Sequence, residues 1–148
     1  MGAGQTAQTV SAFLNSYRTA FERLDAPAIA EHFAYPSHIT SDGDEIGLVA
    51  VAAKEAWIGT LEHLLGMYRS IGFGSARIRD ASPTVLSPRL MQALVHWELH
   101  DGKGLLLYDF QAVYTLARVD ETLRITAIAH NEMPRYRACL ARLRSQSS

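Results

Sequence analysis

Two tyrosines, Tyr17 and Tyr114, and two histidines, His38 and His130, have the side chains and expected positions that suit acid–base chemistry. Both tyrosines fall on apolar faces, and a buried phenol needs a hydrogen-bond partner. Two phenols that donate to one ligand oxygen would form an oxyanion hole, and a nearby histidine could move a proton near neutral pH. We therefore predict these four residues as catalytic candidates, against the simpler interpretation of the tyrosines as core aromatics.

The orientation of both histidines stays open at this level. His38 lies on an expected strand, where alternation relative to Ser37 and Ile39 would place it either near a pocket mouth or in solvent. For His130, a two-residue loop and a three-residue loop before the last strand put opposite faces of that strand inward. If His130 points inward it is the better candidate, because apolar surroundings and a nearby phenol would change its pKa.

A polar group on two expected strands invites comparison with metal sites. It consists of His96, Glu98, His100 and Asp109. Residues four apart on a strand are roughly 13 Å from each other, so His96 and His100 cannot bind one ion. The sequence has no HExxH motif, no CxxC motif and no facial-triad spacing. We predict no metal and no cofactor, and we interpret the group as a polar outer sheet face.

The periodicity of apolar residues predicts the elements that must position these side chains. The helices are expected over residues 6–24, from the N-cap Asp25 to near His32, over 50–70, and as a short final helix opened by Pro134. The strands are expected over residues 33–41, 75–86 (an irregular edge strand), 91–100, 105–119 and 123–131.

The central hairpin can be aligned from its turn, which we expect at residues 101–104. This alignment places Trp97 opposite Tyr108 and Val95 opposite Phe110, so the apolar sides of both strands face the same way, as a half-buried sheet requires. The third helix adds an aromatic stripe to the same interior. The predicted ligand-binding residues are Trp57, Leu61, Tyr68, Trp97, Tyr108 and Phe110.

The order helix, short helix, strand, long helix and antiparallel meander resembles the NTF2-like superfamily over nearly the whole chain. The resemblance is carried by AFLNSYRTAFERLDAPAIAEHFAYPSHITSDG, ALVHWELHDG and YDFQAVYTLARVDETLRITAIAH. It implies an α+β fold, an NTF2-like cone in which a curved antiparallel sheet wraps around the N-terminal helices and leaves a pocket. The superfamily includes ketosteroid isomerases, scytalone dehydratase, SnoaL-like cyclases and many uncharacterised bacterial proteins, and homodimers through the outer sheet face are common in it.

The ketosteroid isomerase site carries over at one of its three positions. The tyrosine that is an oxyanion donor there falls at Tyr17. The catalytic aspartate falls near Ser41, with Asp42 one place on, and the protonated aspartate of the oxyanion hole falls near Tyr114. The resemblance therefore argues against ketosteroid isomerisation itself.

Length and composition bound the class of protein. The 148 residues are 48% hydrophobic and 20% charged, which is typical of one globular domain. We expect a single NTF2-like domain over residues 1–148, with flexible ends at 1–5 and 145–148. The net charge of -1 disfavours nucleic acid, no apolar run suits a membrane, and the single Cys139 favours a reducing compartment, so we expect a cytoplasmic protein.

Two functions are compatible with these observations. The first is binding of a small, mostly apolar ligand, with cofactor-independent isomerase, dehydratase or cyclase chemistry. The second is a non-catalytic homodimerisation module with a closed or vestigial pocket. A cavity of roughly 300 Å³ or more with two convergent polar groups would favour the first, and a filled interior with an apolar outer sheet face would favour the second.

Overall fold

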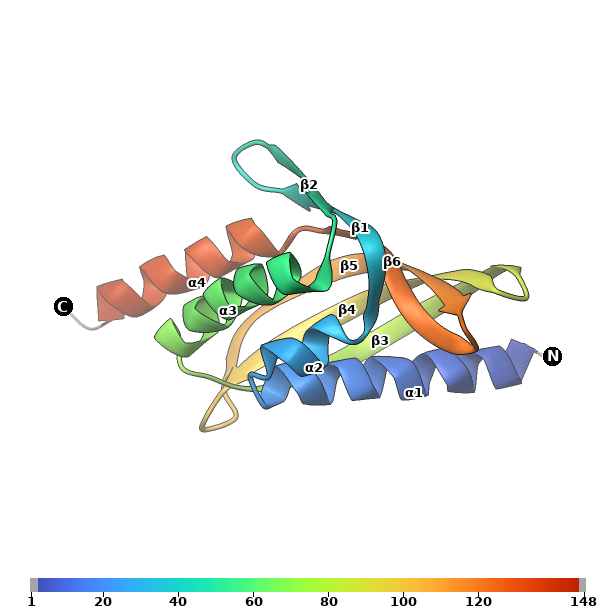
Figure 1. The fold of residues 1–148 in the computed structure, drawn as a ribbon. Helices are drawn as coiled ribbons and strands as arrows, with labels where there is room; N and C mark the ends of the chain where they lie inside the picture. The colour runs from blue at the N-terminus through green and yellow to red at the C-terminus, as the bar shows by residue number, and fades with distance from the viewer. Residues whose placement is uncertain (1–2, 147–148) are drawn as a thin grey trace.

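The computed structural model describes residues 3–146, with side chains from residue 8 onward. The helices are α1 (Ala3–Glu22), α2 (Ala26–Ala30), α3 (Lys54–Ser70) and α4 (Glu132–Gln146). The strands are β1 (Phe33–Asp42), β2 (Ile46–Val51), β3 (Phe73–Ser87), β4 (Leu90–Asp101), β5 (Leu106–Val119) and β6 (Thr122–His130). The strands form one curved sheet with the helices packed along its concave side (Figure 1).

The sheet has the strand order β2-β1-β6-β5-β4-β3. Every neighbouring pair is antiparallel except β1 and β6, which run parallel. A parallel pair needs a long crossover connection, and here α3 and the whole meander lie between the two strands in sequence. The predicted α+β cone is confirmed, with a mostly antiparallel sheet. Among the described residues, no helix is both long and apolar enough to cross a membrane.

The N-terminal helices supply the inner layer. On α1, Val10, Leu14 and Tyr17 are buried, as their helical spacing predicts. The helix ends before Leu24, which adopts a φ of 53°, and the predicted N-cap of α2 is present because Asp25 accepts a hydrogen bond from the Ala28 N–H at 3.1 Å.

Both ends of the chain are helical over part of the segments that we expected to be flexible. The first helix begins at Ala3 and the last extends to Gln146. The rest of the expected flexible ends, residues 1–2 and 147–148, lies outside the described residues.

The hairpin of β1 and β2 is the largest departure from the predicted elements. Residues 46–51 pair antiparallel with β1; we assigned no element to 46–49 and placed 50–51 in the third helix, which begins instead at Lys54. On β1, Ser37 and Ile39 are buried while His38 between them is exposed, so the alternation of this strand turns His38 away from the interior.

The central hairpin keeps its predicted faces but shifts its register by two residues. Trp97 lies opposite Phe110 and Leu99 opposite Tyr108. The cause is a longer turn: the Asp101 carboxylate accepts the N–H groups of both Lys103 and Leu105, and a bulge follows Leu99. A shift of two residues leaves the same side chains inward.

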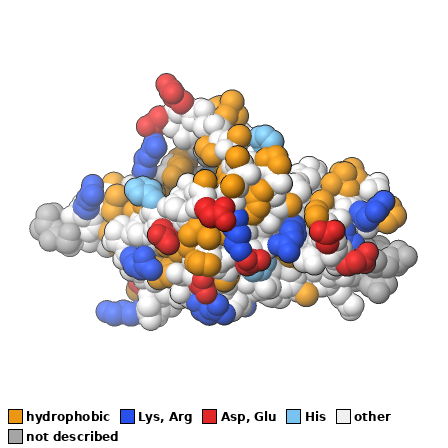
Figure 2. Space-filling model, viewed as in Figure 1, with side chains coloured by type: hydrophobic (Ala, Val, Ile, Leu, Met, Phe, Trp, Pro, Cys, Tyr) orange, Lys and Arg blue, Asp and Glu red, His pale blue; other side chains and the backbone are white. Residues whose placement is uncertain are grey.

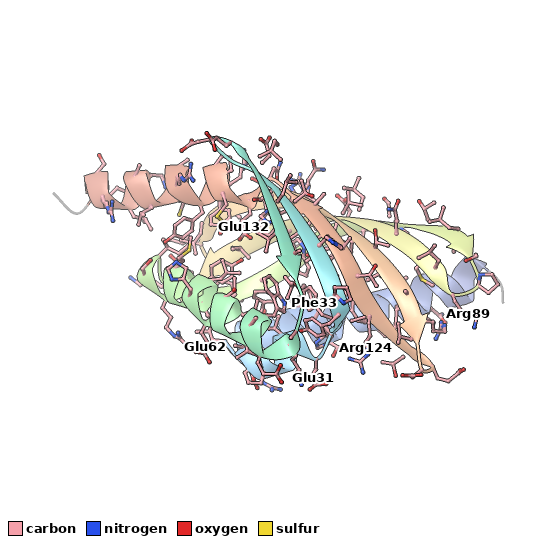
Figure 3. All side chains as sticks on the ribbon, turned by 45° about the horizontal axis from the view of Figure 1, so that its top comes forward. Glu31, Phe33, Glu62, Arg89, Arg124 and Glu132 are labelled. Carbon is pink, nitrogen blue, oxygen red and sulfur yellow. The ribbon has the colours of Figure 1, made fainter. Side chains whose placement is uncertain are left out.

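The last helix starts earlier and runs longer than predicted. Pro134 is its third residue, within the first turn, where the absent N–H has no intrahelical partner to lose. The helix therefore begins at Glu132 and continues for 15 residues. Its own residues Tyr136 and Cys139 are buried on the side that faces the rest of the molecule. Glu132 therefore lies at the first position of α4, just after β6 and close to α3 (Figure 3).

Candidate functional site

A mostly apolar cavity of about 80 Å³ lies between α1, α3 and the concave side of the sheet. Its wall consists of Tyr17, Arg18, Phe21, Trp57, Leu61, Leu64, Tyr68, Phe73, Ala76, Trp97, Leu99, Phe110, Ala112, Tyr114, Ile128, His130 and Glu132. The lining residues that are only partly buried are Arg18, Phe21, Leu64, Phe73 and His130. The volume falls well short of the roughly 300 Å³ that we took to favour ligand binding, so the cavity as it stands suits only a molecule of few heavy atoms.

The structure brings together most of the residues predicted for the site. Of the catalytic candidates, Tyr17, Tyr114 and His130 line the cavity, whereas the exposed His38 lies outside its lining. His130 sits opposite the buried Ala112 of β5, which settles its inward orientation.

Five of the six residues predicted to bind a ligand line the cavity, namely Trp57, Leu61, Tyr68, Trp97 and Phe110. The sixth, Tyr108, is buried but does not belong to the lining. The longer central turn slides Tyr108 along β5, away from Trp97, and its hydroxyl binds a residue of α4 instead.

The two predicted tyrosines form a small hydrogen-bonded group with Trp97. The indole Nε1–H of Trp97 donates to the Tyr114 hydroxyl at 2.9 Å, and the rings of Tyr17 and Tyr114 meet edge to face at 5.8 Å. Burial raises the pKa of both phenols, and the hydroxyl of Tyr17 also interacts with that of Tyr114. Both tyrosines therefore stay neutral at physiological pH and can act as hydrogen-bond donors.

The most unusual group in the wall is the carboxyl of Glu132, which is 6% exposed. Its Oε2 accepts hydrogen bonds from Tyr68 at 2.5 Å and Tyr108 at 2.8 Å. Among residues 8–146, no group donates a hydrogen bond to its Oε1. Burial raises the pKa of Glu132 to about 7, although both phenols favour its charged form.

His130 is held beside Glu132 by the backbone. Its Nδ1 accepts the N–H of Glu132 at 3.1 Å, and burial lowers its pKa. The neutral imidazole must then carry its proton on Nε2, which makes that nitrogen a donor.

The wall thus combines one carboxyl that can gain or lose a proton near neutrality with several neutral donors. The Glu132 charge also contributes to the raised pKa of Tyr17 and Tyr114, so the three side chains interact electrostatically across the cavity. The guanidinium of the partly buried Arg18 pairs with Glu22 at 2.7 Å. Such an arrangement can polarise a carbonyl oxygen and exchange a proton on a neighbouring atom.

Sequence reasoning missed two polar residues of the wall, Arg18 and Glu132. A final helix that opens at Pro134 leaves Glu132 in the preceding loop, where an acidic side chain has no reason to be buried. The signal that could have found it is an acidic residue directly after a strand and at the first turn of a helix, next to the candidate His130.

The polar side chains of the outer sheet face bind one another. His96 Nε2 lies 2.6 Å from an oxygen of Asp109, whose other oxygen binds Arg135 at 2.5 Å, and His100 lies 3.3 Å from Glu98. Within the part of the chain that the structure describes, no three metal-ligating side chains form a cluster that could hold an ion.

The sequence matches one protein family over most of its length. The profile of a family described as NTF2-like protein (DUF6841) matches residues 7–133. A search of curated proteins found no match.

Solved structures similar to this one share its fold at low sequence identity. Aln2 from a Streptomyces species has a TM-score of 0.70 at 12% identity, with 88% of this chain and 93% of that chain covered. An NTF2-like protein of unknown function from Shewanella oneidensis has a TM-score of 0.67 at 16% identity, with coverages of 85% and 98%. A Xanthomonas campestris protein, provisionally described as a calcium/calmodulin dependent protein kinase II association domain, has a TM-score of 0.62 at 15% identity, with coverages of 84% and 86%.

Proposed function

Because the chain belongs to the family of NTF2-like proteins (DUF6841) and holds a buried carboxyl in the wall of its interior cavity, we propose that it binds a small, mostly apolar carbonyl compound and moves a proton on it without a cofactor. The reaction class is isomerisation, dehydration or cyclisation. The single observation that carries this proposal is Glu132, with Oε2 held by two phenols and Oε1 left without a hydrogen bond among the described residues.

The protonation behaviour of Glu132 suits a group that takes a proton and returns it. A catalytic acid or base works best when its pKa lies near the working pH, and burial raises the pKa of Glu132 to about 7. Both its charged and its neutral forms are then populated near neutrality. In the proposed step, Oε1 removes a proton from the carbon beside the carbonyl, and the C–H electron pair moves toward the carbonyl oxygen.

The neutral hydrogen-bond donors in the wall stabilise the negative charge that develops on the carbonyl oxygen. The Tyr114 oxygen already accepts the Trp97 indole N–H, which leaves its own O–H to donate to a ligand oxygen. The Nε2–H of His130 is a further donor on the same wall, while the Tyr17 hydroxyl is engaged with that of Tyr114 and helps to hold it in place. Donors placed where negative charge develops stabilise the enolate, and the proton on Glu132 then returns to a different atom in an isomerisation.

The cavity volume limits the ligand. About 80 Å³ fits a short ketone or aldehyde, or a small ring, without rearrangement. A larger ligand requires the partly buried Phe21, Leu64 and Phe73 to change rotamer.

Exchange of the α-hydrogens of a small ketone, such as cyclopentanone in D₂O, followed by NMR, tests this function. We expect the wild type to accelerate the exchange and Glu132→Gln to lose it by at least about 100-fold, because the amide keeps the shape but cannot take a proton. Tyr35→Phe is the matched control, since the Tyr35 hydroxyl binds the Ala30 carbonyl outside the cavity. Exchange that persists in Glu132→Gln contradicts the role of this carboxyl.

A second function, association of two copies through the outer sheet face, is favoured by a separate observation. A shallow hollow of about 320 Å³ on that side is lined in part by Ile46, Leu94, Val113 and Ala129, and Leu94 is 41% exposed. The Xanthomonas campestris protein with the same fold is provisionally described as an association domain. The molar mass of a Leu94→Asp variant in solution tests this second function.

A further inference from the structure

The sheet has two free edges, β2 and β3, and only one of them is protected against pairing with another strand. Along β3, the Ala76 N–H is bound by the Glu22 carboxylate at 2.9 Å, and Pro83 lacks an N–H. Three register shifts interrupt its pairing with β4, and charged side chains such as Arg77 and Arg79 lie along it. Capped groups, proline, bulges and charges are the devices by which proteins block edge pairing.

The edge formed by β2 has none of these devices within residues 46–51. Its pairing with β1 runs without a shift, and the strand contains no proline and no charged residue. Ile46 is 61% exposed, Leu48 79% and Val49 48%, and Val49 points to the opposite face from the other two. An exposed apolar edge of this kind is a template for an added strand.

The hairpin that carries this edge is accessible and is anchored at both ends. It projects from the body of the molecule (Figure 1), and hydrophobic side chains gather on the projection (Figure 2). Its tip is anchored because Asp44 pairs with Arg137 of α4 at 2.8 Å, and its base is anchored by the pairing of β1 with β6. A preformed strand loses little conformational entropy when it pairs.

We infer that β2 pairs antiparallel with β2 of a second copy of this chain, which joins the two sheets across a two-fold axis at Val49. Acidic side chains at the hairpin tip, including Asp44 and Glu45, precede the apolar strand, and Lys54 follows it. With the axis at Val49, the acidic hairpin tip of each copy lies at the end of the interface where β2 of the other copy leads into Lys54 at the start of α3. A parallel arrangement would instead bring the two acidic tips together.

This charge pattern selects a second copy over an arbitrary extended peptide. In a two-fold interface every contact occurs twice. A strand with one acidic end and one basic end can therefore attract a second copy of itself at both ends of the interface. Lys54 forms an ion pair with Glu31 in its own chain, and its side chain is only 36% exposed. Its attraction to the partner copy therefore helps to select the antiparallel orientation of the two strands more than it strengthens the dimer. The main-chain hydrogen bonds and the apolar side chains supply the affinity.

Light scattering after gel filtration on the full chain tests this interface. We expect a dimer for the wild type. Asp44→Lys and Lys54→Asp each place like charges together twice across the axis and should raise the dimer dissociation constant about tenfold. An equimolar mixture of the two variants should restore the dimer, because each lysine at one position then lies at the same end of the interface as an aspartate at the other.

Two further variants separate this interface from an indirect effect on the hairpin and from association through the outer sheet face. Arg137→Ala breaks the ion pair of Asp44 without placing charge on the edge, so it measures the contribution of the tip anchor alone and should weaken the dimer less than Asp44→Lys does. Leu94→Asp alters the outer sheet face, so it should dissociate a dimer held by that face but leave a dimer held by β2. Circular dichroism verifies that every variant is folded. A monomeric wild type, a dimer that only Leu94→Asp weakens, or a mixture that associates no better than its separate components overturns the inference.

Discussion

Glu132 shows how far one side chain depends on its immediate neighbours. Burying a carboxyl that is only 6% exposed destabilises the fold unless the group is hydrogen-bonded or protonated. Both effects stabilise Glu132. Tyr68 and Tyr108 bind the same oxygen and stabilise the charged form, while burial favours the neutral form. Tyr108 achieves this from behind the wall, so it positions and tunes Glu132 without lining the cavity.

Replacing Tyr108 by Phe should raise the pKa of Glu132 above 7, because the carboxylate loses one of its two donors. The protein should also lose roughly 2 kcal/mol of stability at pH 8, where the carboxylate is charged. NMR titration of the Glu132 carboxyl carbon measures the pKa directly. Tyr136→Phe is the control, since the Tyr136 hydroxyl binds the Met67 carbonyl instead. Equal titration midpoints in both variants would refute the role assigned to Tyr108.

Among the elements, α3 contributes more residues to the apolar wall than any other, namely Trp57, Leu61, Leu64 and Tyr68. Its buried residues Trp57, Leu61, Leu65 and Tyr68 follow the spacing of one helical face. Gly59 lies on the opposite, exposed face, where an added Cβ would meet nothing within 4 Å. Gly74 in β3 is different, because an added Cβ would come within 2.8 Å of the backbone of Asp101.

The same substitution should therefore have opposite effects at these two glycines. Gly59→Ala should stabilise the protein by about 0.5–1 kcal/mol, because alanine lowers the entropy cost of the helix. Gly74→Ala should destabilise it by more than about 1 kcal/mol, because the crowded backbone of the neighbouring turn cannot yield easily. Urea unfolding of the two variants measures both changes. A Gly74→Ala protein as stable as the wild type would show that the two strands can separate at little cost.

For the molecule as a whole, the buried site couples folding to pH. The pKa of Glu132 is raised from 4.5 to about 7, so between these values the folded protein keeps a proton that the unfolded chain releases. The free energy of unfolding must then decrease as pH rises through this range, and level off above it. His130 acts in the opposite direction: burial lowers its pKa, so its contribution to stability is lost as pH falls below about 6.5.

Glu132→Gln should remove the first of these contributions while keeping an oxygen for both phenols to bind. The difference in unfolding free energy between wild type and variant should therefore change by about 3 kcal/mol between pH 4.5 and pH 7, with the wild type favoured at the acidic end. Urea unfolding at a series of pH values gives this difference, and His130 cancels in it. A difference that does not vary with pH would mean that Glu132 titrates as an exposed carboxyl.

The sequence by itself was sufficient for the fold class and for the inner faces of the main helices and strands. Periods of 3.6 and 2 residues are local properties, so they assigned α1, α3, β4 and β5 to their inner faces, with Tyr17 and Tyr114 on the cavity side. The N-cap at Asp25 was equally readable, because capping depends on a few adjacent residues.

Only the tertiary structure decided which polar groups meet. The carboxyl of Glu132 is joined to Tyr68 across 64 residues of sequence and to Tyr108 across 24, and no local pattern encodes such pairings. Only the tertiary structure likewise decided that the His130 side chain points inward and the His38 side chain outward, because these directions follow from strand register. Apolar burial needs only the correct face of an element, whereas a hydrogen bond needs two particular atoms within about 3 Å, and that depends on how distant segments pack.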